Sequence, residues 1–338
     1  MKAKRSSYLF VTMSLLALLI VSMLIAGCTS HGTTATPSTP APAAASSAAA
    51  QSAVPAPAAT PAETATAAPV TSAAPGQTET LTVSGSTTVQ PIAQDAADAF
   101  MKLHPEADIQ VSGGGSGVGI QAITAGSVNI GMSSVDLTPA QKAAIKNCVV
   151  TTVAQDGIAI IVNPKNTLNQ ISLSDAAMVY TGKINSWNAL NGANVPGTNN
   201  NIVLVGRDTS SGTRSYFDSS VLGGASDAST MLQLNSNGAV AQTVAQTPQA
   251  IGYISIGFLS PDVKALSLFT TGGQLIPAST TTVADHTYPI SRNLYMITQG
   301  QPTGLTADYI NFILSPDGQK IVANDGYVPL PANQTQTS

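Results

Sequence analysis

Short apolar runs and segments with helical spacing alternate along the chain from residue 79 onward. The apolar runs have the length of buried strands, and they cover residues 79–83, 108–111, 129–132 and 201–205. Residues 89–103 and 118–125 carry apolar side chains three and four positions apart, which is typical of helices with one buried face. Strands that alternate with helices predict an α/β fold with largely parallel sheets.

A longer β-prone stretch spans residues 149–163. Apolar residues dominate 149–153 and 157–163, and the polar pair Gln155 and Asp156 lies between these two runs. Because this pair separates the apolar runs, we expect the strand to be broken there.

Four of the predicted strands end in turns with serine or threonine and with glycine close by. The clearest of these turns runs from Gly206 to Arg214 and reads Gly-Arg-Asp-Thr-Ser-Ser-Gly-Thr-Arg, just before residues that can open a helix at Ser215. Such a turn points backbone N–H groups at one spot where the helix dipole favours an anion. Its arginines add a planar donor fork suited to oxyanions. The alternative is an ordinary turn whose hydroxyls cap the helix.

Three further turns of the same kind favour the anion site. They cover residues 84–88, 112–117 and 133–134. In open α/β sheets, ligands bind beyond the carboxyl ends of the strands. Four turns at equivalent junctions are therefore expected to converge on one cleft, although a single glycine-rich loop would indicate only a tight turn.

The first 28 residues have the features of a lipoprotein signal peptide. Lys2, Lys4 and Arg5 precede an apolar run, and residues 24–28 read Leu-Ile-Ala-Gly-Cys, which resembles a lipobox. We expect Cys28 to carry a lipid after cleavage, and an uncleaved signal anchor is the alternative. In either case the rest of the chain is expected to be extracytoplasmic, anchored to the outer face of the cytoplasmic membrane.

Residues 29–78 form a low-complexity stretch of Ala, Pro, Ser and Thr, in which Glu63 is the only acidic residue and no Lys or Arg occurs. This composition cannot bury enough apolar surface to form a core. We interpret the stretch as a disordered linker with a reach on the order of 40 Å.

Composition excludes several classes of function. The net charge of −4 and the scattered lysines and arginines give no basic surface for nucleic acid. The three histidines show no spacing with Cys, Asp or Glu that suggests a metal. With Cys28 lipidated, Cys148 has no disulfide partner and is expected to be a small buried residue.

The ordered motifs of residues 80–332 resemble the phosphate-binding proteins of the high-affinity phosphate ABC importer. The motifs that carry the resemblance are 83–89 (VSGSTTV), 114–120 (GGSGVGI), 130–134 (IGMSS), 155–159 (QDGIA), 180–187 (YTGKINSW), 207–214 (RDTSSGTR), 251–255 (IGYIS), 288–292 (YPISR) and 314–320 (LSPDGQK). The resemblance implies a two-lobed type II periplasmic-binding-protein fold, with two mixed sheets flanked by helices and two crossover strands as a hinge. Lobe 1 would comprise residues 79–157 and 289–334, and lobe 2 residues 158–288.

The resemblance also implies which residues hold the anion. The expected phosphate ligands are Ser86, Thr87, Thr88, Ser116, Gly117, Ser134, Asp156, Arg207, Ser211, Gly212 and Thr213. One position departs from the pattern, because related sequences often have arginine where this chain has Val135.

Asp156 has a specific hypothetical role. Phosphate at neutral pH carries a proton that an ionised carboxylate can accept, whereas sulfate has none and would leave that carboxylate unpaired. An unsatisfied buried group costs about 1–3 kcal/mol or more, and a missing hydrogen-bond partner can discriminate by about 10⁴-fold. The alternative is that Asp156 only caps a hinge turn. Asp208 is a candidate to orient Arg207, and Arg214 is expected to be structural.

The sequence favours a binding protein over an enzyme. The loop around Ser116 lacks the G-x-S-x-G elbow, because position 118 is valine, and no histidine lies in a context that suggests a base for a serine nucleophile. The expected function is capture of inorganic phosphate and delivery to ABC permease subunits by a monomer without cofactors. Alternatives are a binding protein for sulfate, molybdate or tungstate, and a surface phosphate sensor without transport.

Overall fold

The computed structural model describes residues 78–270 and 272–331. The predicted signal peptide, Cys28 and nearly all of the predicted linker lie outside these residues. The described residues belong to one compact unit of the chain. Within them, no helix is both long and apolar enough to cross a membrane.

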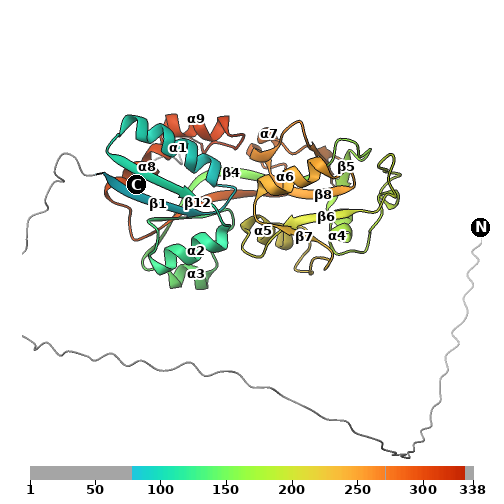
Figure 1. The fold of residues 1–338 in the computed structure, drawn as a ribbon, viewed down its shortest axis with the longest axis horizontal. Coiled ribbons are helices and arrows are strands. Elements are labelled where there is room, and N and C mark those ends of the chain that lie inside the picture. The colour runs from blue at the N-terminus through green and yellow to red at the C-terminus, as the bar shows by residue number, and fades with distance from the viewer. Residues whose placement is uncertain (1–77, 271, 332–338) are drawn as a thin grey trace, which may run out of the picture. The chain divides into compact units, whose positions relative to one another are not determined.

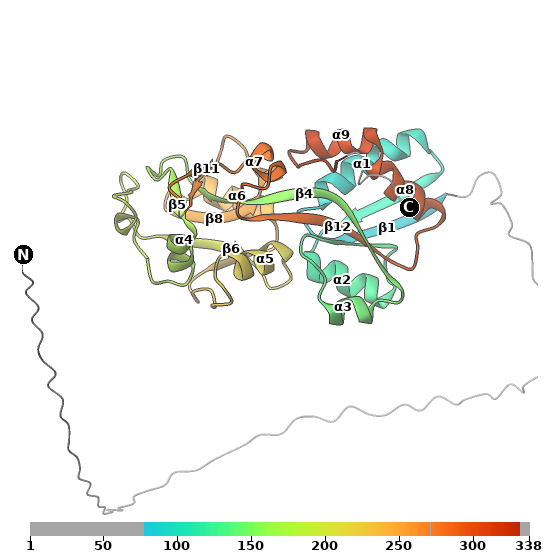
Figure 2. The same cartoon turned by 180° about the vertical axis from the view of Figure 1, so that it is seen from behind.

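The first group of elements, which we call lobe 1, is built on the strand order β2-β1-β3-β12-β4 (Figure 1). The strands are β1 (Glu79–Gly85), β2 (Ala107–Ser112), β3 (Ile130–Ser133), β12 (Ser291–Gln299) and the first half of β4 (Cys148–Val162). The first three strands are parallel, and β12 pairs antiparallel with both β3 and β4. Its helices are α1 (Gln90–Leu103), α2 (Ser116–Ala125), α3 (Pro139–Ala144), α8 (Gly304–Leu314) and α9 (Pro316–Asn324). Both views place α1, α8 and α9 on one side of the sheet and α2 and α3 on the other (Figures 1 and 2).

The second group, lobe 2, continues the same path of strands through β4-β8-β6-β7. These strands are β8 (Ala250–Ser255), β6 (Val203–Arg207) and β7 (Leu232–Leu234), and β9 (Lys264–Ala265) pairs with β4. A small sheet joins β11 (Leu275–Ile276), β10 (Ser267–Phe269) and β5 (Gln170–Ser172). The helices are α4 (Leu173–Tyr180), α5 (Gly212–Ser220), α6 (Asn237–Gln246) and α7 (Thr280–Ala284), with 3₁₀ turns η1 (Trp187–Ala189) and η2 (Ile256–Phe258).

The predicted break in the long β stretch is wrong. Strand β4 runs without interruption from Cys148 to Val162, and Gln155 and Asp156 pair in register with Asn293 and Arg292 of β12. Polar side chains do not interrupt a strand when its backbone groups find partners. Here β12 pairs with β4 on one side, and on the other side Val328 exchanges both backbone hydrogen bonds with Gln155. As a result β4 passes from one lobe into the other as a single strand (Figure 2).

Separate hydrophobic clusters fill the lobes. The main cluster of lobe 1 packs α1 and α8 on the sheet, with Phe100 and Tyr309 among its larger members. The cluster of lobe 2 contains Trp187, which is fully buried and donates from its indole nitrogen to the Gln249 carbonyl at 3.1 Å. Cys148 is only partly buried, because it lies at the start of β4 beside a smaller cluster, so the expectation of full burial is not met.

Candidate functional site

Hydroxyl side chains from both lobes meet at the carboxyl ends of the strands. They follow β1 (Ser86, Thr87 and Thr88), begin α2 (Ser116), follow β3 (Ser134) and flank the start of α5 (Ser211 and Thr213). Each of these side chains is at most 7 % exposed. The structure therefore brings the predicted turns together, and their polar groups must find partners away from water.

Two helices begin at this cluster. Helix α2 starts at Ser116 and α5 starts at Gly212, so both present free N–H groups and a positive dipole end there. The Ser211 hydroxyl also accepts from the Arg214 amide at 3.2 Å. This turn is thus a helix cap as well as part of the cluster, so the two sequence interpretations are compatible.

The lobes touch directly within the cluster. Thr88 Oγ1 lies 3.1 Å from Thr213 Oγ1. Within lobe 1, Ser116 Oγ accepts from the Ser134 amide at 3.0 Å and lies 3.3 Å from Ser134 Oγ. A Cβ on Gly212 would come within 2.2 Å of Ser116 Oγ, so only glycine permits this approach.

A second contact between the lobes involves Ser210, which the sequence interpretation missed. The Gly117 amide donates to the Ser210 carbonyl at 2.8 Å, and Ser210 Oγ donates to the Gly114 carbonyl at 2.8 Å. The Gly117 amide, expected to bind phosphate, is therefore already used by a partner in lobe 2. Ser210 Oγ also lies 2.7 Å from Asp208 Oδ1, which accepts from the Ser210 amide as well, so Asp208 orders this turn.

Arg207 is a buried guanidinium without an acidic partner. Its residue is 1 % exposed, and no carboxylate of the described residues lies within 4.0 Å of it. Nε donates to the Leu234 carbonyl at 3.2 Å, and Nη2 donates to the Asn235 carbonyl at 3.0 Å and to Thr87 Oγ1 at 3.2 Å. Nη1 is buried and has no partner. Burial lowers the pKa of Arg207 to about 10, which leaves it charged at neutral pH.

Arg214 holds the backbone of Arg207 in place. It donates from Nη1 to the Arg207 carbonyl at 3.0 Å and pairs with Asp227 at 2.7 Å and Asp218 at 3.5 Å. Burial and the charge of Asp227 raise the pKa of Asp218 to about 6. These contacts agree with the structural role expected for Arg214.

Asp156 is part of a buried ion pair at the hinge. Its Oδ2 accepts from Arg292 Nε at 3.0 Å and Nη2 at 2.8 Å, and its Oδ1 accepts from Ser255 Oγ at 2.6 Å. Burial raises the pKa of Asp156, and the charge of Arg292 followed by the hydrogen bond from Ser255 oppose that shift.

This arrangement bears on the role predicted for Asp156. An ionised carboxylate has about four acceptor positions, and three hydrogen bonds from Arg292 and Ser255 already occupy most of them. The carboxylate is held mainly by donors of the protein, so we expect it to act on a ligand through Arg292. The side chain balances and orients Arg292.

Arg292 is the main residue that the sequence interpretation missed. Its Nη2 also donates to Thr88 Oγ1 at 3.2 Å and to Thr213 Oγ1 at 3.0 Å, so it joins both lobes, while Nη1 is buried without a partner. Asn237 was missed too, although its Nδ2 donates to Thr88 Oγ1 at 2.9 Å. The motif 288–292 marked Arg292 as part of a recognisable segment, whereas no sequence signal distinguished Asn237.

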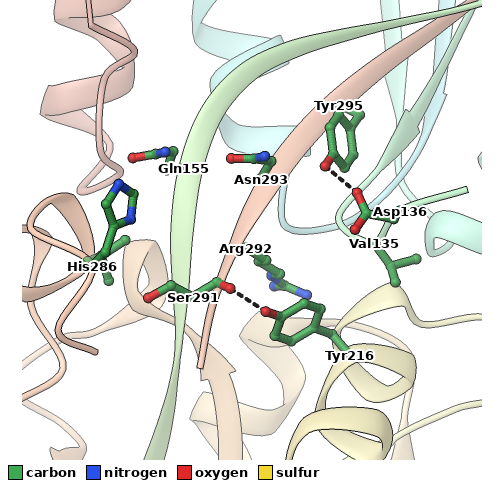
Figure 3. Close-up of a pocket in the computed structure, with 10 residues that line it drawn as sticks. Val135, Asp136, Gln155, Tyr216, His286, Ser291, Arg292, Asn293 and Tyr295 are labelled. Atoms are coloured by element: carbon green, nitrogen blue, oxygen red, sulfur yellow. Dashed lines mark hydrogen bonds between the residues drawn. The ribbon is translucent and has the colours of Figure 1, made fainter. Parts of the chain in front are cut away.

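A cavity of about 300 Å³ lies beside the hinge (Figure 3). Its lining includes Val135, Gln155, Asn293 and the edge of Arg292, and the ring of Tyr216 lies 6.0 Å from the Arg292 guanidinium carbon. The Tyr216 hydroxyl donates to the Ser291 carbonyl. Val135 thus lines the same cavity as Arg292, whose guanidinium comes from β12.

Comparisons with known proteins agree with this architecture. A family model described as "PBP superfamily domain" matches residues 35–317. The phosphate-binding protein PstS of Bacillus subtilis is 37% identical over 252 residues, which cover 74% of this chain and 81% of that protein. A solved phosphate ABC transporter substrate-binding protein from Clostridium perfringens, with bound phosphate, shares 30% identity at a TM-score of 0.68 and covers 75% of this chain and 100% of its own.

An ABC-type phosphate transport receptor from Vibrio cholerae is similar as well. It shares 30% identity at a TM-score of 0.61, over 75% of this chain and 100% of its own. The predicted α/β two-lobed fold is confirmed by these matches. The chain belongs to the PBP superfamily of binding proteins.

Proposed function

We propose that this protein captures inorganic phosphate between its two lobes and delivers it to an ABC permease. The observation that carries the proposal is Arg207, a buried guanidinium with no carboxylate partner and one unpaired nitrogen. A charge buried without compensation costs several kcal/mol. An anion beside Arg207 would remove that cost.

The surroundings of Arg207 fit an oxyanion. Two helix N-termini and several hydroxyls converge next to it, and each can donate to an oxygen. The charges of the cluster sum to about one positive, because Asp156 cancels Arg292 and leaves Arg207 uncompensated. The relatives from Bacillus subtilis and Clostridium perfringens are named for phosphate, which supports phosphate as the anion.

Hydroxyl side chains can accept the proton of a protonated anion, so a free carboxylate is not required. A serine or threonine hydroxyl can rotate to donate or to accept, and the Thr88–Thr213 pair has no fixed donor. We assign as candidate ligands the nine predicted residues other than Gly117 and Asp156, with Arg292 and Asn237 added. The Gly117 amide is bonded to Ser210, and Asp156 acts through Arg292.

Calorimetric titration of the purified protein tests the proposal. Phosphate is expected to bind with a micromolar or lower Kd, and sulfate and molybdate much more weakly. No heat with micromolar phosphate, or tighter binding of another oxyanion, would contradict it.

Delivery and anchoring need separate tests. Deleting the gene should reduce uptake of labelled phosphate at low concentration, whereas a surface sensor without transport would leave uptake unchanged. Cys28→Ala should release the protein from membranes into the soluble fraction if Cys28 carries the lipid.

A further inference from the structure

The chain crosses the hinge region a third time after α9. We use the name C-terminal strap for residues 327–330. Gly326 adopts a left-handed φ of 79° and turns the chain back. The Val328 amide donates to the Gln155 carbonyl at 3.0 Å, and the Gln155 amide donates to the Val328 carbonyl at 2.9 Å, directly beside Asp156. The strap thus adds a short pairing to the crossover strand β4.

Neighbouring residues of the C-terminal strap pack into different lobes. Tyr327 belongs to the hydrophobic cluster of lobe 1 and is 1 % exposed, while Val328 belongs to the cluster of lobe 2. Leu330 returns to lobe 1, where its amide donates to Gln319 Oε1 at 2.7 Å. A movement of one lobe relative to the other must therefore change the packing of the C-terminal strap.

The hydroxyl of Tyr327 contacts the cluster of hydroxyl side chains described above, which we call the anion cluster (Ser86, Thr87, Thr88, Ser116, Ser134, Ser211 and Thr213). It donates to the Thr88 carbonyl at 2.7 Å, and Thr88 is the residue whose Oγ1 contacts Thr213, Asn237 and Arg292. The ring lies against Gly257 of lobe 2, where an added Cβ would come within 2.3 Å of the ring carbon that bears the hydroxyl. Burial raises the pKa of Tyr327, so the hydroxyl remains a donor.

We propose that Tyr327 is a positioning residue that holds the Thr88 loop in its ligand-binding arrangement, and that the C-terminal strap links this loop to lobe 2. The proposal rests on the proposed phosphate function. The hydroxyl fixes the backbone of Thr88, and the backbone in turn sets where the Thr88 side chain meets the other lobe. Because the Tyr327 ring packs against Gly257, a movement of lobe 2 would also displace this tyrosine.

The variant Tyr327→Phe removes one oxygen and keeps the ring. The Kd for phosphate is expected to rise about tenfold, because a buried carbonyl loses its donor. Tyr309→Phe is the matched control. Tyr309 is also fully buried in lobe 1 and donates to a backbone carbonyl, that of Ala93, at 2.5 Å, but it makes no hydrogen bond to the anion cluster. This control should lose thermal stability to a similar extent and keep the parent Kd.

Hydrogen exchange without ligand provides a second readout. The Val89 and Gln90 amides donate to the Ser86 carbonyl at 3.1 and 3.0 Å within this loop. Their exchange should become faster in Tyr327→Phe and stay unchanged in Tyr309→Phe. Equal exchange and equal Kd in the two variants would overturn the positioning role. A parent protein that binds no phosphate, with exchange that still differs between the variants, would overturn only the proposed function.

Discussion

Replacing Asp156 with asparagine removes one charge from a fully buried ion pair and keeps the shape of the side chain. The carboxylate and the guanidinium of Arg292 are 0 and 2 % exposed, so solvent cannot replace the lost partner. Breaking a buried pair from one side typically costs about 3–5 kcal/mol. We therefore expect Asp156→Asn to lower the free energy of unfolding by about 3–5 kcal/mol at neutral pH, measured by urea denaturation followed by circular dichroism.

The same variant discriminates between two explanations of anion selectivity. If Asp156 accepted the ligand proton, its loss would remove discrimination of up to about 10⁴-fold between phosphate and sulfate. Because most of its acceptor positions are occupied by Arg292 and Ser255, we expect the ratio of the two Kd values to change by less than about threefold. Calorimetric titrations with both anions measure this ratio.

A double variant provides the control. D156N/R292Q has no buried charge at this position, so its loss of stability should be clearly smaller than the sum of the two single losses. The reasoning would be refuted if Asp156→Asn kept the parent stability, or if its selectivity for phosphate over sulfate collapsed.

Three further substitutions test other parts of the structure. Gly212→Ala should weaken phosphate binding about 10- to 100-fold, because its Cβ meets a serine hydroxyl of the other lobe at 2.2 Å; Gly238→Ala, at an open helical position, should leave calorimetric affinity unchanged. Arg207→Lys should raise the phosphate Kd about 100-fold in the same assay, because a single ammonium cannot reproduce the fork, and an unchanged Kd would exclude Arg207 as a ligand. Burial, then the charge of Asp95, raises the pKa of Asp325 to about 7. A raised carboxyl pKa gives stability that is present at low pH and lost as the pH rises from about 4 to about 7. Asp325→Asn should therefore raise the melting temperature at about pH 8 and not at about pH 4, and equal effects at both would contradict the shift.

Local chemistry made much of the site predictable. Strands that end in hydroxyl- and glycine-rich turns could be recognised because the conformation of each turn depends on its own few residues. The order of strands and helices then placed the turns at one end of the sheet. The turns that contain Ser86, Ser134 and Thr213 were located in this way, whereas their assignment as ligands came from the resemblance and stays a prediction. The α/β class followed from the alternation of short apolar runs with segments of helical spacing.

Partners that are distant in sequence were not predictable from local patterns. The Asp156–Arg292 pair depends on the register of β4 against β12, which joins residues 136 positions apart. The use of the Gly117 amide by Ser210 likewise depends on how the two lobes meet. The continuity of β4 was missed because two polar residues resemble a turn when the strand that pairs with them is not known.

The hydrogen bonds between Ser210 and the glycine-rich loop have a consequence for how long cargo is retained. Both bonds join the lobes without involving a ligand, so they favour closure even in an empty protein. At about 1 kcal/mol each, they shift the open–closed equilibrium roughly 30-fold towards the closed form. In a receptor with this bias, less of the free energy of ligand binding is needed to close the lobes. The same two bonds must break when the lobes reopen. Any partner that separates the lobes to release the ligand would have to break these two bonds as well.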